Sequence, residues 1–112
     1  MKIKIKVPSK VYYGCHTFKV FLKDESLPDD EAQVYHLLQE IRVRDNVPLS
    51  RRNVAFIHEN IHCINLHYSC DLSEETIEKL AEGLGRLLFS TLGIELDWSG
   101  IPTKTATIKG EK

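Results

Sequence analysis

The amino-terminal half of the chain alternates between apolar and polar residues, as strands with one buried face do. Every second residue of 2–7 is apolar until Pro8 ends the alternation, which predicts a first strand. β-Branched and aromatic residues over 11–22 predict a second strand, bent or turned at Gly14. After a polar connection over 24–31, residues 34–43 are predicted as a further strand.

From about residue 50 the apolar spacing changes to three and four residues, the period of a helix that packs on a core. A first helix is predicted over about 50–66, because Val54, Ile57, Ile61 and Ile64 share one face. A second is predicted over about 73–91, after the capping residues of the preceding segment. Residues 94–98 are predicted as a short closing strand.

Because the strands precede the helices, the pattern predicts an α+β fold, a small twisted amino-terminal β-sheet packed on two helices. The chain has 112 residues, enough for one small core. We therefore expect a single domain over 1–102. Residues 103–112 are polar and poor in core residues, so they are expected to form a disordered tail.

Charge and composition exclude several partners. Fifteen basic and sixteen acidic residues leave a net charge of -1, so nucleic acid is not an expected partner. No apolar run approaches the roughly 20 residues of a membrane span, and the start lacks a signal-peptide core. A cytoplasmic protein is expected. Three cysteines are too few for a disulfide framework, and the oligomeric state stays open.

The first predicted helix carries an H-E-x-x-H sequence, His58-Glu59-Asn60-Ile61-His62. Residues four apart on a helix lie one turn above each other, so both imidazoles can reach one zinc ion. Glu59 then projects beside the ion, where a general base is needed. The spacing therefore predicts one zinc ion per chain, with His58 and His62 as ligands and Glu59 as the catalytic residue.

The third zinc ligand is sought among the glutamates of the second predicted helix, which are Glu74, Glu75, Glu78 and Glu82. With Ile77 at zero and steps of about 100° per residue, Glu74 lies at about 60°, at the edge of the buried face. It stands in the first turn, where the helix dipole alone would also favour an acid. Glu74 is the predicted third ligand.

The remaining glutamates have other expected roles. Glu78, at about 100° on the same wheel, is predicted to accept a hydrogen bond from a ligating imidazole and to orient it. Glu75 and Glu82 fall near the opposite pole, where Lys79 and Arg86 follow them at i,i+4. Such pairs are typical of a solvated helix face.

A competing metal site is open to the same sequence. His62, Cys63, His67 and Cys70 are close in the chain and can in principle form a four-ligand structural zinc site. Against it, Cys63 lies about 100° from His62 on a helix, and no C-x-x-C knuckle is present. Cys63 is more simply a small core residue.

The segments HENIH and SEETIEKLA together resemble the gluzincin zinc peptidases, and most closely the small zincin-like proteins of phages and prophages. They are also similar to the catalytic core of ImmA/IrrE-type regulators. The resemblance covers residues 34–91, where Glu74, Glu78, Leu80 and Ala81 match the family's glutamate helix. It implies a minimal zincin-like fold in which His58, His62 and Glu74 bind zinc.

The resemblance also implies an activity, which is hydrolysis of an amide bond in a peptide or protein, with Glu59 as the general base. The strand before the first helix, with Gln39, Ile41 and Val43, would be the edge that aligns an extended substrate. Tyr68, His67 and His36 are possible oxyanion-stabilising residues, although no spacing selects one. A phage or bacterial host is expected, and the alternative function is a zinc-binding but inactive interaction domain.

Overall fold

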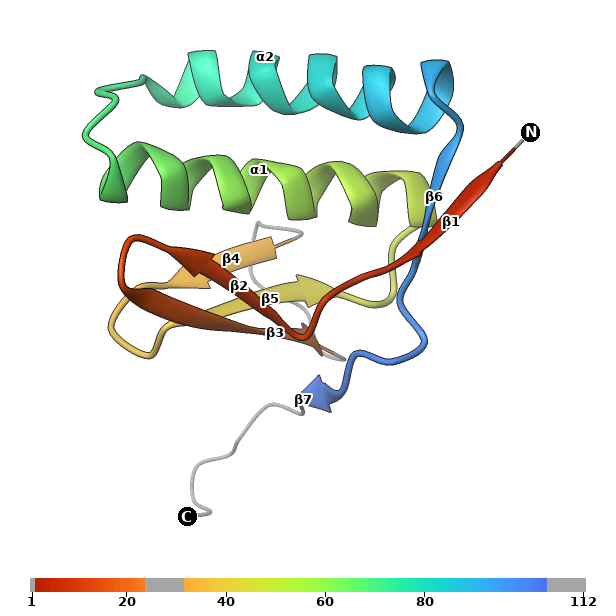
Figure 1. Ribbon diagram of the computed structural model, residues 1–112, viewed down its shortest axis with the longest axis horizontal. Helices are drawn as coiled ribbons and strands as arrows, with labels where there is room; N and C mark the ends of the chain where they lie inside the picture. The colour runs from red at the N-terminus through yellow and green to blue at the C-terminus, as the bar shows by residue number, and fades with distance from the viewer. Residues whose placement is uncertain (1, 24–31, 105–112) are drawn as a thin grey trace.

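The computed structural model describes residues 2–23 and 32–104 (Figure 1). Its helices are α1 (Leu49–His67) and α2 (Glu74–Gly85), and α2 continues into a π-helical segment, η1 (Arg86–Thr91). The seven strands are β1 (Ile3–Lys6), β2 (Lys10–Tyr13), β3 (His16–Lys23), β4 (Ala32–Tyr35), β5 (Glu40–Arg44), β6 (Ile94–Asp97) and β7 (Thr103–Lys104). Both predicted helices and the closing strand are present.

The main sheet is mixed and has the order β2-β3-β5-β4. β3 runs parallel to β5, whereas β2 and β4 are antiparallel to their neighbours. Strands β1 and β6 lie near opposite ends of the chain and form a separate parallel pair. A mixed sheet packed against helices confirms the predicted α+β class.

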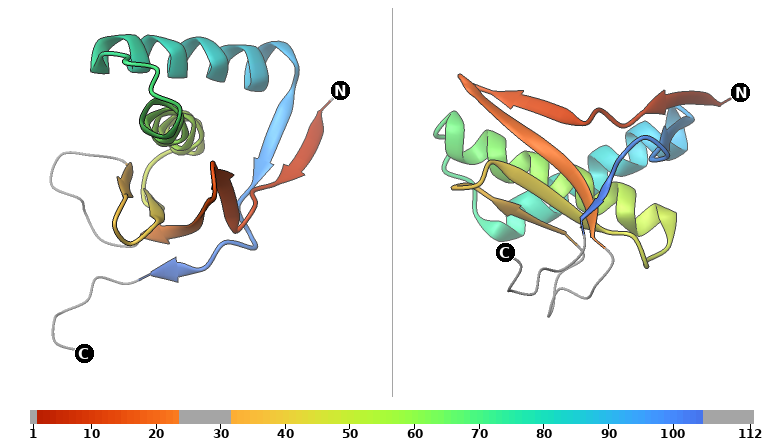
Figure 2. Two further views of the ribbon diagram at one scale, coloured as in Figure 1. Left: turned by 60° about the vertical axis from the view of Figure 1, so that its left-hand side comes forward. Right: turned by 90° about the horizontal axis from the view of Figure 1, so that it is seen from below.

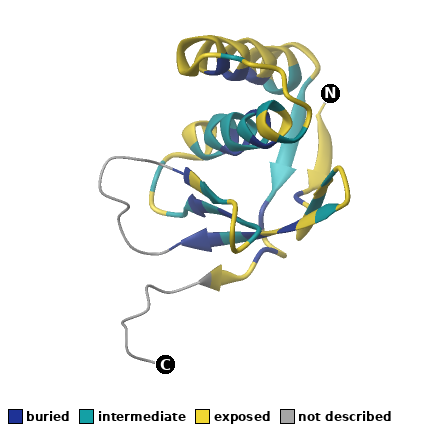
Figure 3. Ribbon diagram, turned by 90° about the vertical axis from the view of Figure 1, so that its left-hand side faces the viewer, coloured by how far each residue is buried: buried dark blue, intermediate teal, exposed yellow. Residues whose placement is uncertain are grey.

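Helix α1 is the middle of three layers, with the sheet on one side and α2 on the other (Figures 1 and 2). Toward the sheet it buries Phe56 and Cys63 in the main core. Toward α2 it buries Ile61 against Ile77 and Ala81. Figure 3 shows buried residues on the inner sides of both helices and exposed residues over the outer side of α2. The predicted apolar stripe of α1 is therefore its α2 face, and a second buried face lies opposite.

Two predicted strands are in fact hairpins. Residues 11–22 belong to β2 and β3, which are joined at Gly14, whose φ of 61° suits glycine. Residues 34–43 were predicted as one strand, but they span β4, a turn and β5. Leu37 continues the apolar pattern of a strand yet is 99% exposed in that turn, so the pattern there was misleading.

The predicted substrate-aligning edge, with Gln39, Ile41 and Val43, is wrong. β5 has hydrogen-bonded neighbours on both sides, β3 and β4, and its Ile41 and Val43 are 0% exposed. Gln39 precedes it in the turn with a φ of 54°. Within the described residues, β4 is instead the outer strand on this side of the sheet. β5 is an inner strand because it pairs with β3, which is distant in the chain, and such pairing cannot be predicted from the local sequence.

The carboxyl-terminal end differs slightly from expectation. Thr103 and Lys104 form β7, which pairs with Leu22 and Lys23 of β3, so regular structure extends two residues past the predicted boundary. The remainder of the predicted tail, 105–112, and the predicted connection 24–31 lie outside the described residues. None of the described helices combines the length and the apolar composition needed to cross a membrane.

Candidate metal centre

His58 and His62 lie on a side of α1 that neither the sheet nor α2 fully covers. They are one helical turn apart, and their side chains are 20% and 29% exposed. The uninterrupted helix from Leu49 to His67 therefore places both imidazoles toward the same point, as the sequence predicted.

The loop between the helices brings Glu74 to that point. Asn65 clamps the loop, because its Oδ1 accepts the Leu72 N–H (2.8 Å) and its Nδ2 donates to the Leu72 carbonyl (3.3 Å). Ser73 then caps α2 by accepting the Thr76 N–H (3.1 Å). Glu74 follows in the first turn and reaches back over α1. The sequence predicted Glu74 as a ligand. It did not predict that Asn65, near the end of α1, would hold the loop in place.

The three side chains meet at distances that suit a metal ion. Glu74 Oε2 lies 2.9 Å from His58 Nε2, its Oε1 lies 3.0 Å from His62 Nε2, and the two Nε2 atoms are 3.2 Å apart. Ligands about 2.0–2.1 Å from a tetrahedral zinc ion lie about 3.3 Å from each other. The three residues can therefore hold a metal ion, and no other histidine, cysteine and carboxylate group in 2–23 and 32–104 converges in this way.

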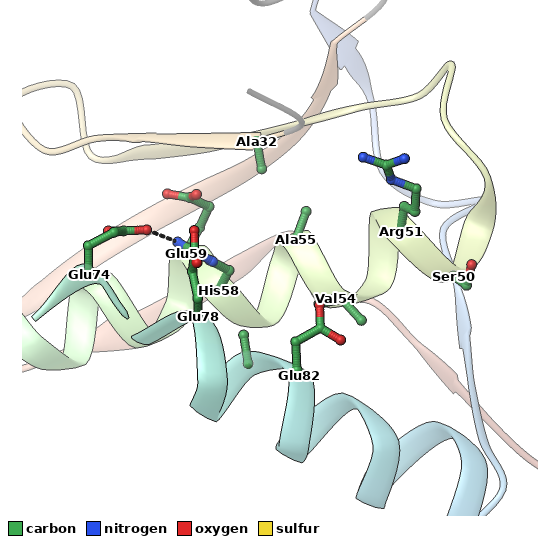
Figure 4. Close-up of a pocket in the computed structure, with 11 residues that line it drawn as sticks. Ala32, Ser50, Arg51, Val54, Ala55, His58, Glu59, Glu74, Glu78 and Glu82 are labelled. Carbon is green, nitrogen blue, oxygen red and sulfur yellow. Dashed lines mark ion pairs between the residues drawn. The ribbon is translucent and has the colours of Figure 1, made fainter. Parts of the chain in front are cut away.

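Glu59 lies next to His58 on α1, at the side of the centre that faces Ala32 of β4 (Figure 4). Its side chain is half-buried. Burial first, and the charge of Glu59 second, raise the pKa of the Cys63 thiol to about 12. The structure thus places the predicted base beside the candidate ligands, in the same groove.

That groove has a volume of about 730 Å³ and is open to solvent along α1. Its floor is α1, one wall is α2 and the other includes Ala32 of β4 (Figure 4). Its lining residues are Ala32, Ser50, Arg51, Val54, Ala55, His58, Glu59, Glu74, Glu78, Ala81 and Glu82. Two of the three candidate ligands, His58 and Glu74, therefore line this groove together with Glu59.

The other glutamates of α2 only partly follow the helical wheel. Glu75 forms the expected ion pair with Lys79 (3.2 Å) on the outer face. Glu82 is exposed, as its angle on the wheel predicted, but it forms no ion pair with Arg86 among the described residues, and it also borders the groove. Glu78 also lines the groove, but no hydrogen bond joins it to an imidazole of the described chain, and its orienting role stays a prediction.

The competing four-ligand site is not formed. Cys63 is fully buried in the core on the sheet side of α1. Cys70 is exposed in the loop, where its Sγ lies 3.9 Å from the Ile64 carbonyl oxygen. Because these side chains point to different surroundings, Cys63 is the small core residue of the simpler interpretation.

A second histidine cluster, which sequence analysis missed, lies at the carboxyl end of α1. The His67 ring lies 5.0 Å from that of His16 and 6.3 Å from that of His36, and Tyr13 stacks on it at 6.4 Å. The edge-on Phe18 ring is 5.5 Å away. These residues come from β2, β3, α1 and the β4–β5 turn, so no spacing along the chain could reveal the cluster.

None of the three possible oxyanion-stabilising residues lines the metal groove. Tyr68 accepts the Gly14 N–H at 2.8 Å, which ties the end of α1 to the β2–β3 turn. His67 packs in the second cluster. Burial lowers the pKa of His36, and the neighbouring His67 and His62 imidazoles lower it further. Comparisons with protein-family models, with curated proteins and with solved structures found no match for this chain.

Proposed function

We propose that the protein is a zinc-dependent peptidase with a minimal zincin-like fold. The single observation that carries the proposal is the spacing of the His58, His62 and Glu74 ligand atoms, 2.9–3.2 Å, beside a groove that His58 and Glu74 line. Two imidazoles and one carboxylate are a frequent ligand set of catalytic zinc, which keeps a fourth position open. The H-E-x-x-H resemblance supports the same ion.

The roles of the residues follow from their chemistry. His58, His62 and Glu74 would hold the ion, which when bound polarises a carbonyl and lowers the pKa of water toward about 7. The Glu59 carboxylate would take the proton from the attacking water and give it to the leaving amine. Glu59 lies beside the ligands in the groove, the position that both transfers require.

The substrate in this proposal is an extended peptide segment. β4 borders the groove through Ala32 and is the outer strand of the sheet on this side within the described residues. A peptide added along β4 would lie over α1 and pass the metal centre. The aligning role that the sequence assigned to β5 therefore passes to β4 in the proposal.

One observation favours a second candidate, a zinc-binding domain without catalysis. None of Tyr68, His67 and His36, the residues considered for stabilising a developing oxyanion, lines the groove. The two functions share the metal and differ in turnover.

Zinc content and peptide hydrolysis, measured on the same samples, test the proposal. Protein purified without an affinity tag or added metal should contain about one zinc per chain. The Glu59→Gln variant should keep that zinc and lose about 10²–10⁴-fold in hydrolysis of a peptide library. Glu75→Gln, on the outer face of α2, is the matched control.

Hydrolysis that survives Glu59→Gln would refute the assigned base. Zinc without any hydrolysis by the unmodified protein would select the inactive domain instead. Absence of zinc would remove both candidates.

A further inference from the structure

The metal groove continues into a second cavity, away from the triad. This cavity has a volume of about 440 Å³ and shares Ser50, Val54 and Glu82 with the first. Val54 is one helical turn before His58, and Ser50 is one turn further, so the cavity lies about 6–12 Å from the metal ligands along α1. That distance corresponds to about two to four residues of an extended chain.

The inner surface of the second cavity is mainly apolar. Its apolar lining residues are Leu49, Val54, Gly85, Phe89 and Ile94. A Cβ at Gly85 would lie 3.0 Å from Val54 Cγ2, so the absence of a side chain there lets α1 and α2 approach closely beneath the cavity. An apolar side chain is the occupant that such a lining favours.

Two carboxylates separate the metal from this cavity. Glu78 and Glu82 are one turn apart on α2, both line the groove, and like charges at this spacing repel each other. Within residues 2–23 and 32–104, neither has an ion pair. Arg51, a cation that lines this groove, is already engaged in another interaction. The cations Lys2 and Arg86 line the second cavity, where Glu95 also lies. The stretch nearest the metal is therefore acidic.

We propose that the groove selects a peptide segment with a basic side chain at Glu78 and Glu82 and an apolar side chain in the second cavity. Phe89 is seven residues beyond Glu82, which is about 10 Å along the helix, or three residues of extended peptide. The basic residue would stand on the metal side of the apolar one. That the occupant is a peptide rests on the proposed function, whereas the charge and the apolar preference rest on the two cavities.

Peptide binding tests this specificity without requiring turnover. The probe is a degenerate library of fluorescein-labelled ten-residue peptides rich in lysine and leucine, compared with a library in which glutamate replaces lysine. Zinc-loaded Glu59→Gln protein should bind the lysine library at least about tenfold more tightly by fluorescence anisotropy, because two carboxylates face one cation. Adding Glu82→Gln should reduce that ratio about threefold or more, whereas adding Glu75→Gln should leave it unchanged.

The apolar half has its own variant. Leu49 lines only the second cavity, is half exposed and is the first residue of α1, where an acidic residue suits the helix dipole. Leu49→Asp should therefore fold, and it should remove the preference for leucine over alanine in the lysine library.

Equal binding of the lysine and glutamate libraries would overturn the inference. A preference that Glu75→Gln reduces as much as Glu82→Gln does would also overturn it, since a general charge effect would then explain the result. Failure of the proposed function shows differently, as absence of cleavage by the unmodified protein while the lysine preference persists.

Discussion

Two histidine clusters lie at helix α1, with similar distances between their rings but different surroundings. The His58 and His62 ring centroids are 4.9 Å apart, and those of His16 and His67 are 5.0 Å apart. The first pair shares the carboxylate of Glu74 and opens on a groove. His67 is instead packed against aromatic rings, and its Nε2 is buried without a hydrogen-bond partner among residues 2–23 and 32–104. A metal centre thus needs ligand atoms that converge on one point, and imidazole density alone does not make one.

The largest expected difference between the clusters is in zinc affinity. His58→Ala/His62→Ala should lower it by at least about 10⁴-fold, because even the outer partners of a zinc ligand contribute 10- to 100-fold each. Elemental mass spectrometry of protein purified without added metal measures the loss. The matched variant, His16→Gln/His36→Gln in the second cluster, should retain about one zinc per chain. Zinc that follows the second cluster would reverse the comparison.

The reactivity of the cysteines tests the competing metal site, which would combine His62 of the first cluster with His67 of the second and with Cys63 and Cys70. The pKa of Cys63 is raised to about 12, mainly by burial, whereas Cys15 and Cys70 are exposed. Only the thiolate form of a cysteine reacts with a disulfide reagent. At pH 8 such a reagent should therefore label Cys15 and Cys70 about 10³-fold faster than Cys63. Counting released chromophore with and without denaturant checks this. Three fast thiols would show that Cys63 is not part of the core.

A smaller effect is expected from replacing the centre of the second cluster. His67→Phe removes a buried nitrogen that has no hydrogen-bond partner in the described part of the chain, and it keeps a ring between Tyr13 and Phe18. The free energy of unfolding should rise by about 1 kcal/mol, which raises Tm by about 4 °C. Zinc content should not change. A lower Tm would mean that the nitrogen has a role beyond packing.

The smallest expected effect is a pH dependence. The pKa of His36 is lowered in the folded chain by burial and by neighbouring imidazoles, so below about pH 6.5 the unfolded chain binds more protons at this residue. Its contribution to stability is therefore complete above that pH and decreases as the pH falls. Urea unfolding at pH 7.5 and 5.5 should show this loss, and His36→Gln should reduce it. An unchanged loss in the variant would assign it to other groups.

The helices and the candidate ligands were predictable because their signals are local. One turn of α1 relates His58 to His62, and the angle of Glu74 relative to Ile77 is a property of α2 alone. The apolar stripe likewise found the α2 face of α1. On the sheet face of α1, Cys63 was predicted as a small core residue, whereas Phe56 was not singled out because it lies outside that stripe.

The strands were less predictable because their partners are distant in the chain. The apolar residues of 34–43 suggested one strand, yet Leu37 lies in a turn and β5 is enclosed by β3 and β4. Glu82 is exposed, as its angle predicted, but the angle did not show that it also borders the groove. An angle gives the direction of a side chain and not what stands opposite.

The amino-acid sequence by itself thus determined the α+β class, the two helices and the His58, His62 and Glu74 set, because helical period and capping act within a few residues. Only the tertiary structure decided which strand is outermost, how Asn65 holds the start of α2 over α1, and where the groove and the second histidine cluster lie. Those features depend on pairing and packing between residues far apart in the chain, which no local pattern encodes.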